Sequence, residues 1–468
     1  MEQNTSNNGN LPFTNKSDDN PADKSTKNQN RKEKPQKDPF LQKMEYAHIL
    51  ICSLVLIVFF IVGCAFFARP KVSEIEKREL NKFPSFNMND FLSGKYTSDI
   101  SLWYSDTYPT REGMISASDA IKSLYGIKGS QFSSGNSSGD DIPDTPMNPN
   151  KPSDTDSPNP PDDENHEKGE QIGAFYVRGD TAFELYHFNQ SNSQRYASLI
   201  NSAADSLSGK AHVYDLIVPL SYTFAFNSDE LSSTGASDCE KAISYIYSGL
   251  SQNVSAVNIC QNMHSHKNEY LYYRTDHHWT ARGAYYAYES FCSAKGISPT
   301  PLSSYERLEF GGFLGTLYAD TKANALKNNP DTVEAFVPMG TNIASVTERN
   351  GNITKYSIVN KQTDKFYANA ASKYNCFIAG DNPLTEIHNP DKTDNSSIVV
   401  IKESFGNAFV PFLVDSYEYV YVIDYRYFSG NLYDFVTSHN VGDVLFINNV
   451  IATSTSARLN EMEKIIKK

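Results

Sequence analysis

The stretch Arg274-Thr275-Asp276-His277-His278-Trp279-Thr280 places an acid, two imidazoles and an indole within seven residues. It lies between an aromatic, strand-like run at 269–273 and a helical run at 281–294. Junctions between a strand and a helix commonly carry the reactive side chains of α/β enzymes. If the junction is extended, Asp276 and His278 point to one side and the intervening histidine to the other. A carboxylate beside an imidazole fixes the tautomer of the ring, so the pattern predicts an acid–base pair.

Two other interpretations of this stretch stay open. His264 and His266 lie just upstream, so these two side chains could ligate a metal ion together with Asp276, His277 and His278. The helical spacings of zinc ligands are missing and no cysteine pair is present, so we expect no metal. The second alternative is a purely structural polar junction. The acid–base interpretation requires a nucleophile from elsewhere in the chain.

Residues 398–409, Ile-Val-Val-Ile-Lys-Glu-Ser-Phe-Gly-Asn-Ala-Phe, predict strand, turn and helix, with Ser404 where the strand ends. Its hydroxyl would lie at the carboxyl edge of a sheet, the usual ligand side. N–H groups at the start of the helix can hold an oxyanion. Gly380 and Asn382, after another predicted strand, offer a backbone N–H and a side-chain amide for the same hole. The competing interpretation of Ser404 is a helix N-cap.

Residues 47–68 form a run of 22 residues without Lys, Arg, Asp or Glu, long enough to cross a bilayer as a helix. Residues 1–46 are polar, which predicts a disordered tail, and five basic residues between positions 31 and 43 favour a cytoplasmic N-terminus. A cleaved signal peptide is the alternative, against which the long polar tail argues. We therefore expect a single-pass signal anchor in the cell membrane, with the C-terminal bulk extracytoplasmic.

The remaining chain is predicted to form one α/β domain in two pieces. Residues 69–128 are its N-terminal arm. Residues 129–170 contain seven prolines and many Ser, Asp and Asn, which predicts a disordered insertion, although a linker between two domains would have the same composition. Residues 171–468 form the catalytic domain, in which strand-like and helical runs alternate.

The pattern of residues 171–468 indicates a mostly parallel sheet. A hairpin is expected around Arg178-Gly179-Asp180, and short antiparallel strands within 320–370. The expected helices are 191–208 and 237–250, and the expected strands are 212–218, 254–259, 374–379, 398–401, 420–423 and 444–447. Helical runs separate the last three strands, the rhythm of a parallel sheet in an α/β fold.

Composition excludes some functions. The net charge of −13 argues against nucleic acid, although residues 131–170 hold ten acids and only two lysines, so the folded part is mildly acidic. The glycine-rich stretch 311–318 lacks the spacing of a phosphate-binding loop, and we expect no cofactor. Four scattered cysteines read as small buried residues for which a disulfide is possible but not required, namely Cys239, Cys260, Cys292 and Cys376.

Asp276-His277-His278-Trp279 resembles the signature of the bacterial DHHW proteins. The similarity covers roughly residues 70–460 apart from the insertion, through Arg78-Glu79-Leu80, Phe313-Leu314-Gly315-Thr316-Leu317-Tyr318, Asp331-Thr332-Val333, Lys402-Glu403-Ser404-Phe405-Gly406-Asn407 and Asp424-Tyr425-Arg426-Tyr427-Phe428. This family is similar to the J- and X-type alginate O-acetyltransferases. The resemblance implies an SGNH-hydrolase-like fold, a flavodoxin-like parallel sheet with flanking helices and the motifs in permuted order.

The resemblance also implies roles for individual residues. Asp276 and His278 would be the acid and the base, and Ser404 the nucleophile. Lys402-Glu403-Ser404 stands where the related proteins have Gly-Asp-Ser, which keeps the serine but changes the residues before it. His277, Trp279 and Arg426 are candidates for substrate contact.

These residues lead to an expected function. We expect an O-acetyltransferase or acetylesterase that acts on a cell-envelope or secreted polysaccharide, with Ser404 attacking an acetyl donor. A multi-pass membrane O-acyltransferase is a partner implied by the resemblance alone. The alternative is a catalytically inactive polysaccharide-binding or scaffold protein, which the unusual Glu403 would favour.

Overall fold

The computed structural model describes residues 169–467 continuously, together with 139–148, 95–109 and scattered positions between 53 and 91. Residues 1–69 and 70–468 form separate compact units, and the features below belong to the second. The predicted tail and membrane span, residues 1–68, lie outside the described residues apart from Ser53. Within the described part of the chain, none of the helices combines the length and apolar content that a membrane crossing requires.

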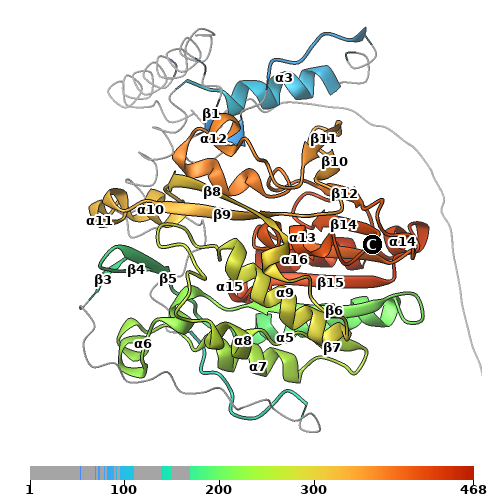
Figure 1. The fold of residues 1–468 in the computed structure, drawn as a ribbon. Helices are drawn as coiled ribbons and strands as arrows, with labels where there is room; N and C mark the ends of the chain where they lie inside the picture. The colour runs from blue at the N-terminus through green and yellow to red at the C-terminus, as the bar shows by residue number, and fades with distance from the viewer. Residues whose placement is uncertain are drawn as a thin grey trace, which may run out of the picture. The chain divides into compact units, whose positions relative to one another are not determined.

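A mixed sheet of eight strands forms the centre of the domain, with the order β11-β10-β12-β14-β13-β15-β6-β7 (Figure 1). Five neighbouring strands are parallel: β14 (Tyr419–Asp424), β13 (Ser397–Lys402), β15 (Asp443–Asn449), β6 (His212–Val218) and β7 (Val254–Ala256). Three strands extend the sheet in antiparallel fashion: β12 (Leu384–His388), β10 (Ile343–Thr347) and β11 (Ile353–Ser357). The predicted α/β class is confirmed, with a mixed rather than a parallel sheet.

Two hydrophobic cores cover the two faces of the sheet. Because alternate side chains of a strand point to opposite faces, Ile398 and Val400 of β13 join one core and Val399 and Ile401 the other. Helices α9 (Ala281–Lys295) and α13 (Gly406–Leu413) contribute to the first core, and α5 (Gln190–Ser206), α7 (Cys239–Ser248), α14 (Leu432–Ser438) and α16 (Ser456–Ile466) to the second. Burial on both faces explains why these strands are continuously apolar.

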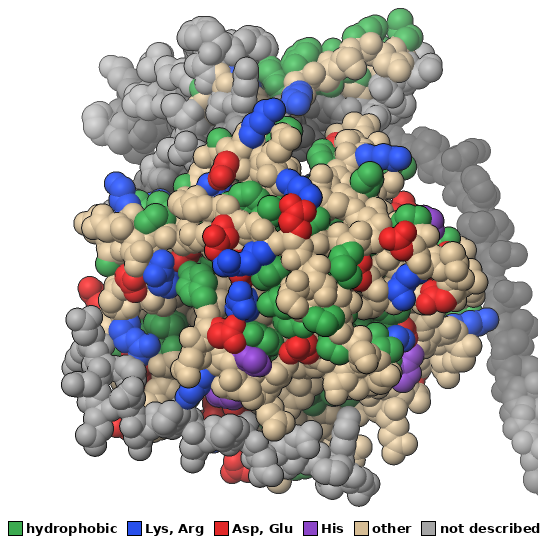
Figure 2. Space-filling model, in the orientation of Figure 1, with side chains coloured by type: hydrophobic (Ala, Val, Ile, Leu, Met, Phe, Trp, Pro, Cys, Tyr) green, Lys and Arg blue, Asp and Glu red, His purple; other side chains and the backbone are tan. Residues whose placement is uncertain are grey.

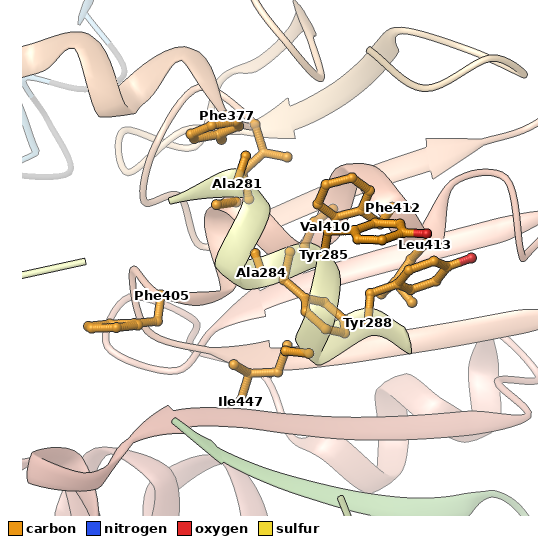
Figure 3. Close-up of a cluster of buried hydrophobic side chains, with 14 of the residues drawn as sticks. Ala281, Ala284, Tyr285, Tyr288, Phe377, Phe405, Val410, Phe412, Leu413 and Ile447 are labelled. Atoms are coloured by element: carbon orange, nitrogen blue, oxygen red, sulfur yellow. The ribbon is translucent and has the colours of Figure 1, made fainter. Parts of the chain in front are cut away.

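Figure 3 shows how α9 and α13 pack together. Tyr285 and Tyr288 of α9 lie against Phe412 of α13, with ring centroids 5.3 and 5.8 Å from that of Phe412. Helix α9 begins directly after the histidine-rich stretch, with Thr280 as its N-cap, and α13 begins directly after Ser404-Phe405. This packing therefore brings the starts of the two helices, and the predicted base and nucleophile with them, to one place.

Two small sheets lie beside the main one. The first is antiparallel and contains β3 (Glu170–Ile172), β4 (Phe175–Arg178) and β5 (Thr181–Glu184), which confirms the predicted hairpin. The second pairs β8 (Glu306–Phe313) with β9 (Asp331–Val337). The N–H of Ala182 in β5 donates to the Arg274 carbonyl at 3.0 Å, so the first sheet holds one end of the histidine stretch.

The remaining elements are short. The arm contains β1 (Val72–Ser73), β2 (Arg78–Glu79) and α3 (Lys95–Asp106). The other helices are η2 (Ser221–Phe224), α6 (Ser228–Thr234), α8 (Cys260–Ser265), η3 (Leu302–Ser304), α10 (Thr316–Thr321), α11 (Asn324–Asn328), α12 (Thr363–Phe366), η4 (Ala370–Cys376) and α15 (Val450–Ser454). The four cysteines within residues 171–468, at positions 239, 260, 292 and 376, are buried free thiols. On the face in Figure 2, basic and acidic side chains are interspersed.

The predicted strand at 374–379 is wrong. Its first part is the 3₁₀ helix η4, and Ile378, Ala379 and Gly380 follow with φ of 46°, 57° and 78°. Positive φ is incompatible with a strand. Ile378 and Ala379 are not glycines, and residues other than glycine rarely adopt positive φ. The strand begins after this turn, as β12, and runs antiparallel to β14.

Part of the predicted disordered insertion packs on the domain. The N–H of Asp140 donates to the Phe188 carbonyl at 2.9 Å, and the N–H of Met147 donates to Ser248 Oγ at 2.9 Å. Ile142 and Met147 pack against the second core. Residues 129–170 were expected to be disordered, but residues 139–148 are ordered. Two apolar side chains in this polar, proline-rich segment pack on the core and hold residues 139–148 in place.

Candidate active site

Three predicted residues form one hydrogen-bonded line. His278 Nε2 lies 2.7 Å from Ser404 Oγ, and His278 Nδ1 lies 2.6 Å from Asp276 Oδ1. Ser404 occupies the turn between β13 and α13 and is partly exposed, whereas only 3% of Asp276 and 6% of His278 is exposed. A hydroxyl, an imidazole and a buried carboxylate in this order can generate a nucleophile.

A tight loop, not an extended strand, makes this pairing. Residues 274–278 are bends closed by a bridge between Tyr272 and Trp279, and the N–H of His278 donates to Asp276 Oδ1 at 3.1 Å. The expected alternation is wrong, because the ring centroid of His277 lies only 3.9 Å from that of His278. The two imidazoles are neighbours on one side of the loop.

The second oxygen of Asp276 is held by Thr316 at the start of α10. Asp276 Oδ2 accepts the Thr316 N–H at 2.8 Å and the Thr316 hydroxyl at 3.1 Å. A Cβ on Gly315 would lie 2.1 Å from Asp276 Cβ, so the close approach of α10 requires glycine. Sequence reasoning placed Gly315 and Thr316 in a glycine-rich stretch without assigning them a role.

His277 joins this network through the same threonine. Its Nδ1 lies 2.5 Å from Thr316 Oγ1. Because the threonine donates its only hydroxyl proton to the carboxylate, His277 must donate to the threonine from a protonated Nδ1. Burial and the charge of His278 lower the pKa of His277, which favours the neutral ring. His277 thus supports Asp276 through one intermediate hydroxyl.

Asp331 anchors the histidine loop from β9. Its buried carboxylate accepts the Thr275 N–H at 2.8 Å and the Thr275 hydroxyl at 2.7 Å, and Arg274 Nε lies 3.2 Å away. The Tyr270 hydroxyl donates to the same carboxylate. The loop is therefore fixed at the residues directly before Asp276.

Tyr374 touches both the predicted base and the predicted nucleophile. Its ring lies parallel to that of His278, with centroids 4.1 Å apart and an interplanar angle of 14°. Its hydroxyl donates to the backbone carbonyl of Ser404 at 3.1 Å. The strand expected at 374–379 hides any role for Tyr374, so sequence reasoning misses this residue.

Trp279 does not meet the expectation of substrate contact. It is fully buried, and its Nε1–H donates to the Phe405 carbonyl at 2.9 Å. A side chain without exposed surface cannot line a binding site, so the predicted role is wrong. Trp279 instead braces the turn that carries Ser404.

Arg426 belongs to a buried cluster of four charges. Its Nε and NH2 lie 2.8 and 2.6 Å from Asp424, and NH2 lies 2.9 Å from Asp381. Lys402 Nζ lies 2.9 Å from both carboxylates. Although burial opposes ionisation, Arg426 and Lys402 hold the pKa of Asp381 well below its usual range. The cluster ties the end of β13 to the segments after β14 and η4, and a substrate contact by Arg426 stays a prediction.

The two predicted oxyanion donors are engaged elsewhere. The N–H of Gly380 donates to the Phe377 carbonyl at 2.9 Å, and Asn382 Nδ2 donates to the Ala379 carbonyl at 3.1 Å. The N–H of Ser404 donates to no group among the described residues. At the start of α13, this N–H is the donor that the structure leaves available.

The ligand atoms of Asp276, His277 and His278 lie within 4.8 Å of one another, a spacing that a metal ion would accept. However, both ring nitrogens of His278 and Nδ1 of His277 already have hydrogen-bond partners. The upstream histidines are held elsewhere, since His264 Nε2 lies 2.7 Å from Glu240 and His266 stacks on Tyr286. Metal binding by this group would break the line to Ser404.

The family model described as DHHW protein matches residues 76–157 and 152–423. No curated protein matches the sequence. Among solved structures, a DHHW family protein from Eubacterium siraeum DSM 15702 is 28% identical, with a TM-score of 0.59 over 65% of this chain and 99% of that one.

Two further structures are more distant. Bacillus cereus PatB1, solved with a sulfonyl adduct, is 17% identical, with a TM-score of 0.52 over 62% of this chain and 97% of that one, which shows a shared fold alone. The O-acetyltransferase domain of Pseudomonas putida AlgJ is 14% identical, with a TM-score of 0.32 over 61% of this chain and 96% of that one, a likeness too slight to support an argument. Because the family model matches most of the sequence, this chain belongs to the DHHW protein family.

Proposed function

We propose that this chain is a serine O-acetyltransferase or acetylesterase that handles O-acetyl groups of a cell-envelope or secreted polysaccharide. The observation that carries the proposal is the line from Asp276 through His278 to Ser404, with distances of 2.6 and 2.7 Å. The fold shared with PatB1 and the motifs shared with alginate O-acetyltransferases support it. An SGNH-like core with permuted motifs is part of the same proposal.

The first half-reaction forms an acetyl-enzyme. Ser404 Oγ attacks the acetyl carbonyl carbon and passes its proton to His278 Nε2, while Asp276 stabilises the imidazolium. The carbonyl oxygen becomes an oxyanion, for which the Ser404 N–H is the available donor. When the tetrahedral intermediate collapses, the leaving oxygen takes the proton from His278. The products are acetyl-Ser404 and the deacetylated donor.

The second half-reaction reverses these roles. A hydroxyl gives its proton to His278 Nε2 and attacks the acetyl carbon, and Ser404 Oγ recovers the proton as it leaves. With water as the acceptor the products are acetate and free enzyme; with a sugar hydroxyl the product is an acetylated saccharide. Transfer and hydrolysis therefore share every protein group and differ only in the acceptor.

The cellular setting is also a proposal. The apolar run 47–68 and the basic residues before it favour a signal anchor with an extracytoplasmic domain. A multi-pass membrane O-acyltransferase would then supply acetyl groups across the bilayer. Protease added outside intact cells should digest the domain and leave a small N-terminal membrane fragment, and a protected domain would refute this topology.

The experiment for the chemistry is acetate release from a chromogenic acetyl ester by the full-length protein. Ser404→Ala should abolish turnover. The matched control is Ser233→Ala, which removes an exposed hydroxyl on α6 and should leave turnover unchanged. If both variants match the wild type, the hydrolase-like mechanism is wrong.

One feature favours the alternative of a catalytically inactive polysaccharide-binding or scaffold protein. The carboxyl group of Glu403 lies 3.2 Å from Ser404 Oγ, where an ionised carboxylate would oppose the negative charge of the reaction. This alternative predicts saccharide binding without any ester turnover in the wild type.

A further inference from the structure

Glu403 is a buried carboxyl group in direct contact with the nucleophile. Only 5% of the residue is exposed. Its Oε2 lies 3.2 Å from Ser404 Oγ and accepts the Phe405 N–H at 3.3 Å, and its Oε1 accepts the Asn449 N–H at 3.0 Å. The side chain therefore contacts the same hydroxyl as His278 and also reaches the start of α13.

No cation pairs with this carboxyl group among the described residues. The two cations nearby in the sequence and the fold, Lys402 and Arg426, bond to Asp381 and Asp424 instead. A buried carboxylate without a cation is costly, and such a group tends to take up a proton. Burial raises the pKa of Glu403 despite the opposing charge of Arg426, whereas the pKa of Asp381 is lowered. The cations of the cluster thus stabilise the ionised form of Asp381, whereas burial favours the protonated form of Glu403.

The number of protons available between Ser404 and Glu403 also favours a protonated, neutral Glu403. Ser404 has one hydroxyl proton, and attack requires that it point to His278 Nε2, 2.7 Å away. An ionised Glu403 can only accept, so it would compete for that proton. A protonated Oε2 donates to Ser404 Oγ and still accepts the Phe405 N–H, so each group then has a compatible partner.

We propose that Glu403 is a further catalytic residue, which acts in its protonated form by donating a hydrogen bond from Oε2 to the reacting oxygens at Ser404. This rests on the proposed function. In the resting state the acceptor is Ser404 Oγ; as negative charge builds up, the same donor stabilises it together with the Ser404 N–H. A carboxylic acid kept neutral by its surroundings is a known means of supplying such a donor. Glu403 thereby supplies a hydrogen-bond donor to the site, whereas the two predicted donors, Gly380 and Asn382, bond to backbone carbonyls.

The proposal predicts the direction in which catalytic activity changes with pH. Catalysis is present while Glu403 is protonated and is lost as the pH rises through its raised pKa. The titratable or charged groups that influence it come from five segments, namely Glu184 of β5, His277 of the histidine loop, Tyr374 of η4, Tyr425 and Arg426 after β14, and Ser404 itself. Glu403→Gln and Glu403→Ala leave all of these groups in place.

The test is the pH profile of kcat/KM for a chromogenic acetyl ester, with wild type, Glu403→Gln and Glu403→Ala. The wild type should lose activity on the alkaline side. Glu403→Gln keeps a donor but cannot ionise, so it should stay within about tenfold of the wild-type maximum and lose the alkaline decline. Glu403→Ala lacks the donor, so its activity should lie about 10²-fold below the wild-type maximum at every pH. Thermal melting shows whether each variant is folded.

Three results would overturn the proposal: a wild type without an alkaline decline, an unchanged decline in Glu403→Gln, or an inactive but folded Glu403→Gln. The last would mean that the negative charge is needed. Should Glu403→Ala fail to fold, the profile of the isosteric Gln variant still decides. Ser404→Ala separates this proposal from the one beneath it, because turnover in that variant would refute the serine mechanism as a whole.

Discussion

The ring of Tyr374 lies parallel to the imidazole of His278 at a centroid distance of 4.1 Å, while its hydroxyl donates to the Ser404 carbonyl at 3.1 Å. One side chain therefore fixes the plane of the proposed base and the backbone of the proposed nucleophile. An aromatic face also favours a neighbouring cation, and the imidazole becomes one during the reaction. Tyr374 is a positioning residue that is expected to act on turnover more than on substrate affinity.

Tyr374→Phe keeps the ring contact and loses the hydroxyl bond, so kcat should fall by no more than about tenfold. Tyr374→Leu loses both contacts, and kcat should fall by about 10²-fold with KM little changed. Ester kinetics for both variants make the measurement. Tyr285→Leu is the control, because it removes another buried tyrosine of the same core and should lower the melting temperature without lowering turnover per folded molecule. Equal kinetic effects of Tyr374→Leu and Tyr285→Leu would contradict a positioning role.

The two adjacent histidines are expected to be unequal, although for a different reason than alternation along a strand. His278→Gln removes the base, and Asp276→Asn holds the ring in the wrong tautomer, so each should cost several orders of magnitude in turnover. His277 bonds to Thr316, which in turn bonds to Asp276, so His277→Gln and Thr316→Val should each cost about tenfold or less. Turnover of the four variants, normalised to folded protein, tests this order. Equal loss from both histidine changes would revive the metal site, and loss of wild-type activity with a chelator and recovery with zinc would decide for it.

Stability should depend on a carboxyl group that takes no part in the proposed chemistry. Asp215 is buried in β6, where Oδ1 accepts the Tyr196 hydroxyl at 2.6 Å and Oδ2 has no partner. Burial raises the pKa of Asp215 from 3.8 to about 7. The folded state therefore binds more protons than the unfolded state between these values, and stability falls as the pH rises from about 4 to about 7.

The measurement is the melting temperature across this range for the wild type and Asp215→Asn. The variant cannot ionise and should flatten the decline, whereas Asp205→Asn at the exposed end of α5 should leave it unchanged. A decline of the same slope in Asp215→Asn would assign it to other groups.

The insertion should divide into a packed and a replaceable part. Met147→Ser removes an apolar side chain from the second core and should destabilise the domain by about 1–3 kcal/mol. Replacing residues 149–168 with a Gly/Ser linker should leave the melting temperature nearly unchanged, since their composition cannot form a core. Chemical denaturation of both variants distinguishes the two parts. A large loss from the linker variant would show that the whole segment is structural.

The sequence was sufficient where one physical rule decided the outcome. The apolar strands 398–401, 420–423 and 444–447 lie within β13, β14 and β15 because a strand buried on both faces must be continuously apolar. Ser404 was predictable for the same reason, since it ends such a strand. Asp276 and His278 were paired correctly but from the wrong geometry.

The remainder depends on contacts between residues far apart in the chain. Tyr374, Thr316 and Asp331 reach the histidine loop from three separate segments, and no local pattern distinguishes them from ordinary core or turn residues. The left-handed turn at 378–380 was invisible because Ile378 and Ala379 are not residues that favour it. In the sequence, Trp279 is an aromatic residue beside a reactive motif. Only its burial shows that it supports the turn that carries Ser404 and does not contact substrate.

The most direct test of the central claim, that Asp276, His278 and Ser404 act as one set, is covalent labelling mapped by peptide mass spectrometry. The full-length protein is treated with a sulfonyl fluoride, a reagent that requires an activated serine. We predict one adduct, on the peptide that contains Ser404, at a rate that falls by orders of magnitude in His278→Gln and Asp276→Asn while Ser233→Ala labels like the wild type. A folded wild type that takes up no label at Ser404, or labelling that is indifferent to His278, would contradict the account.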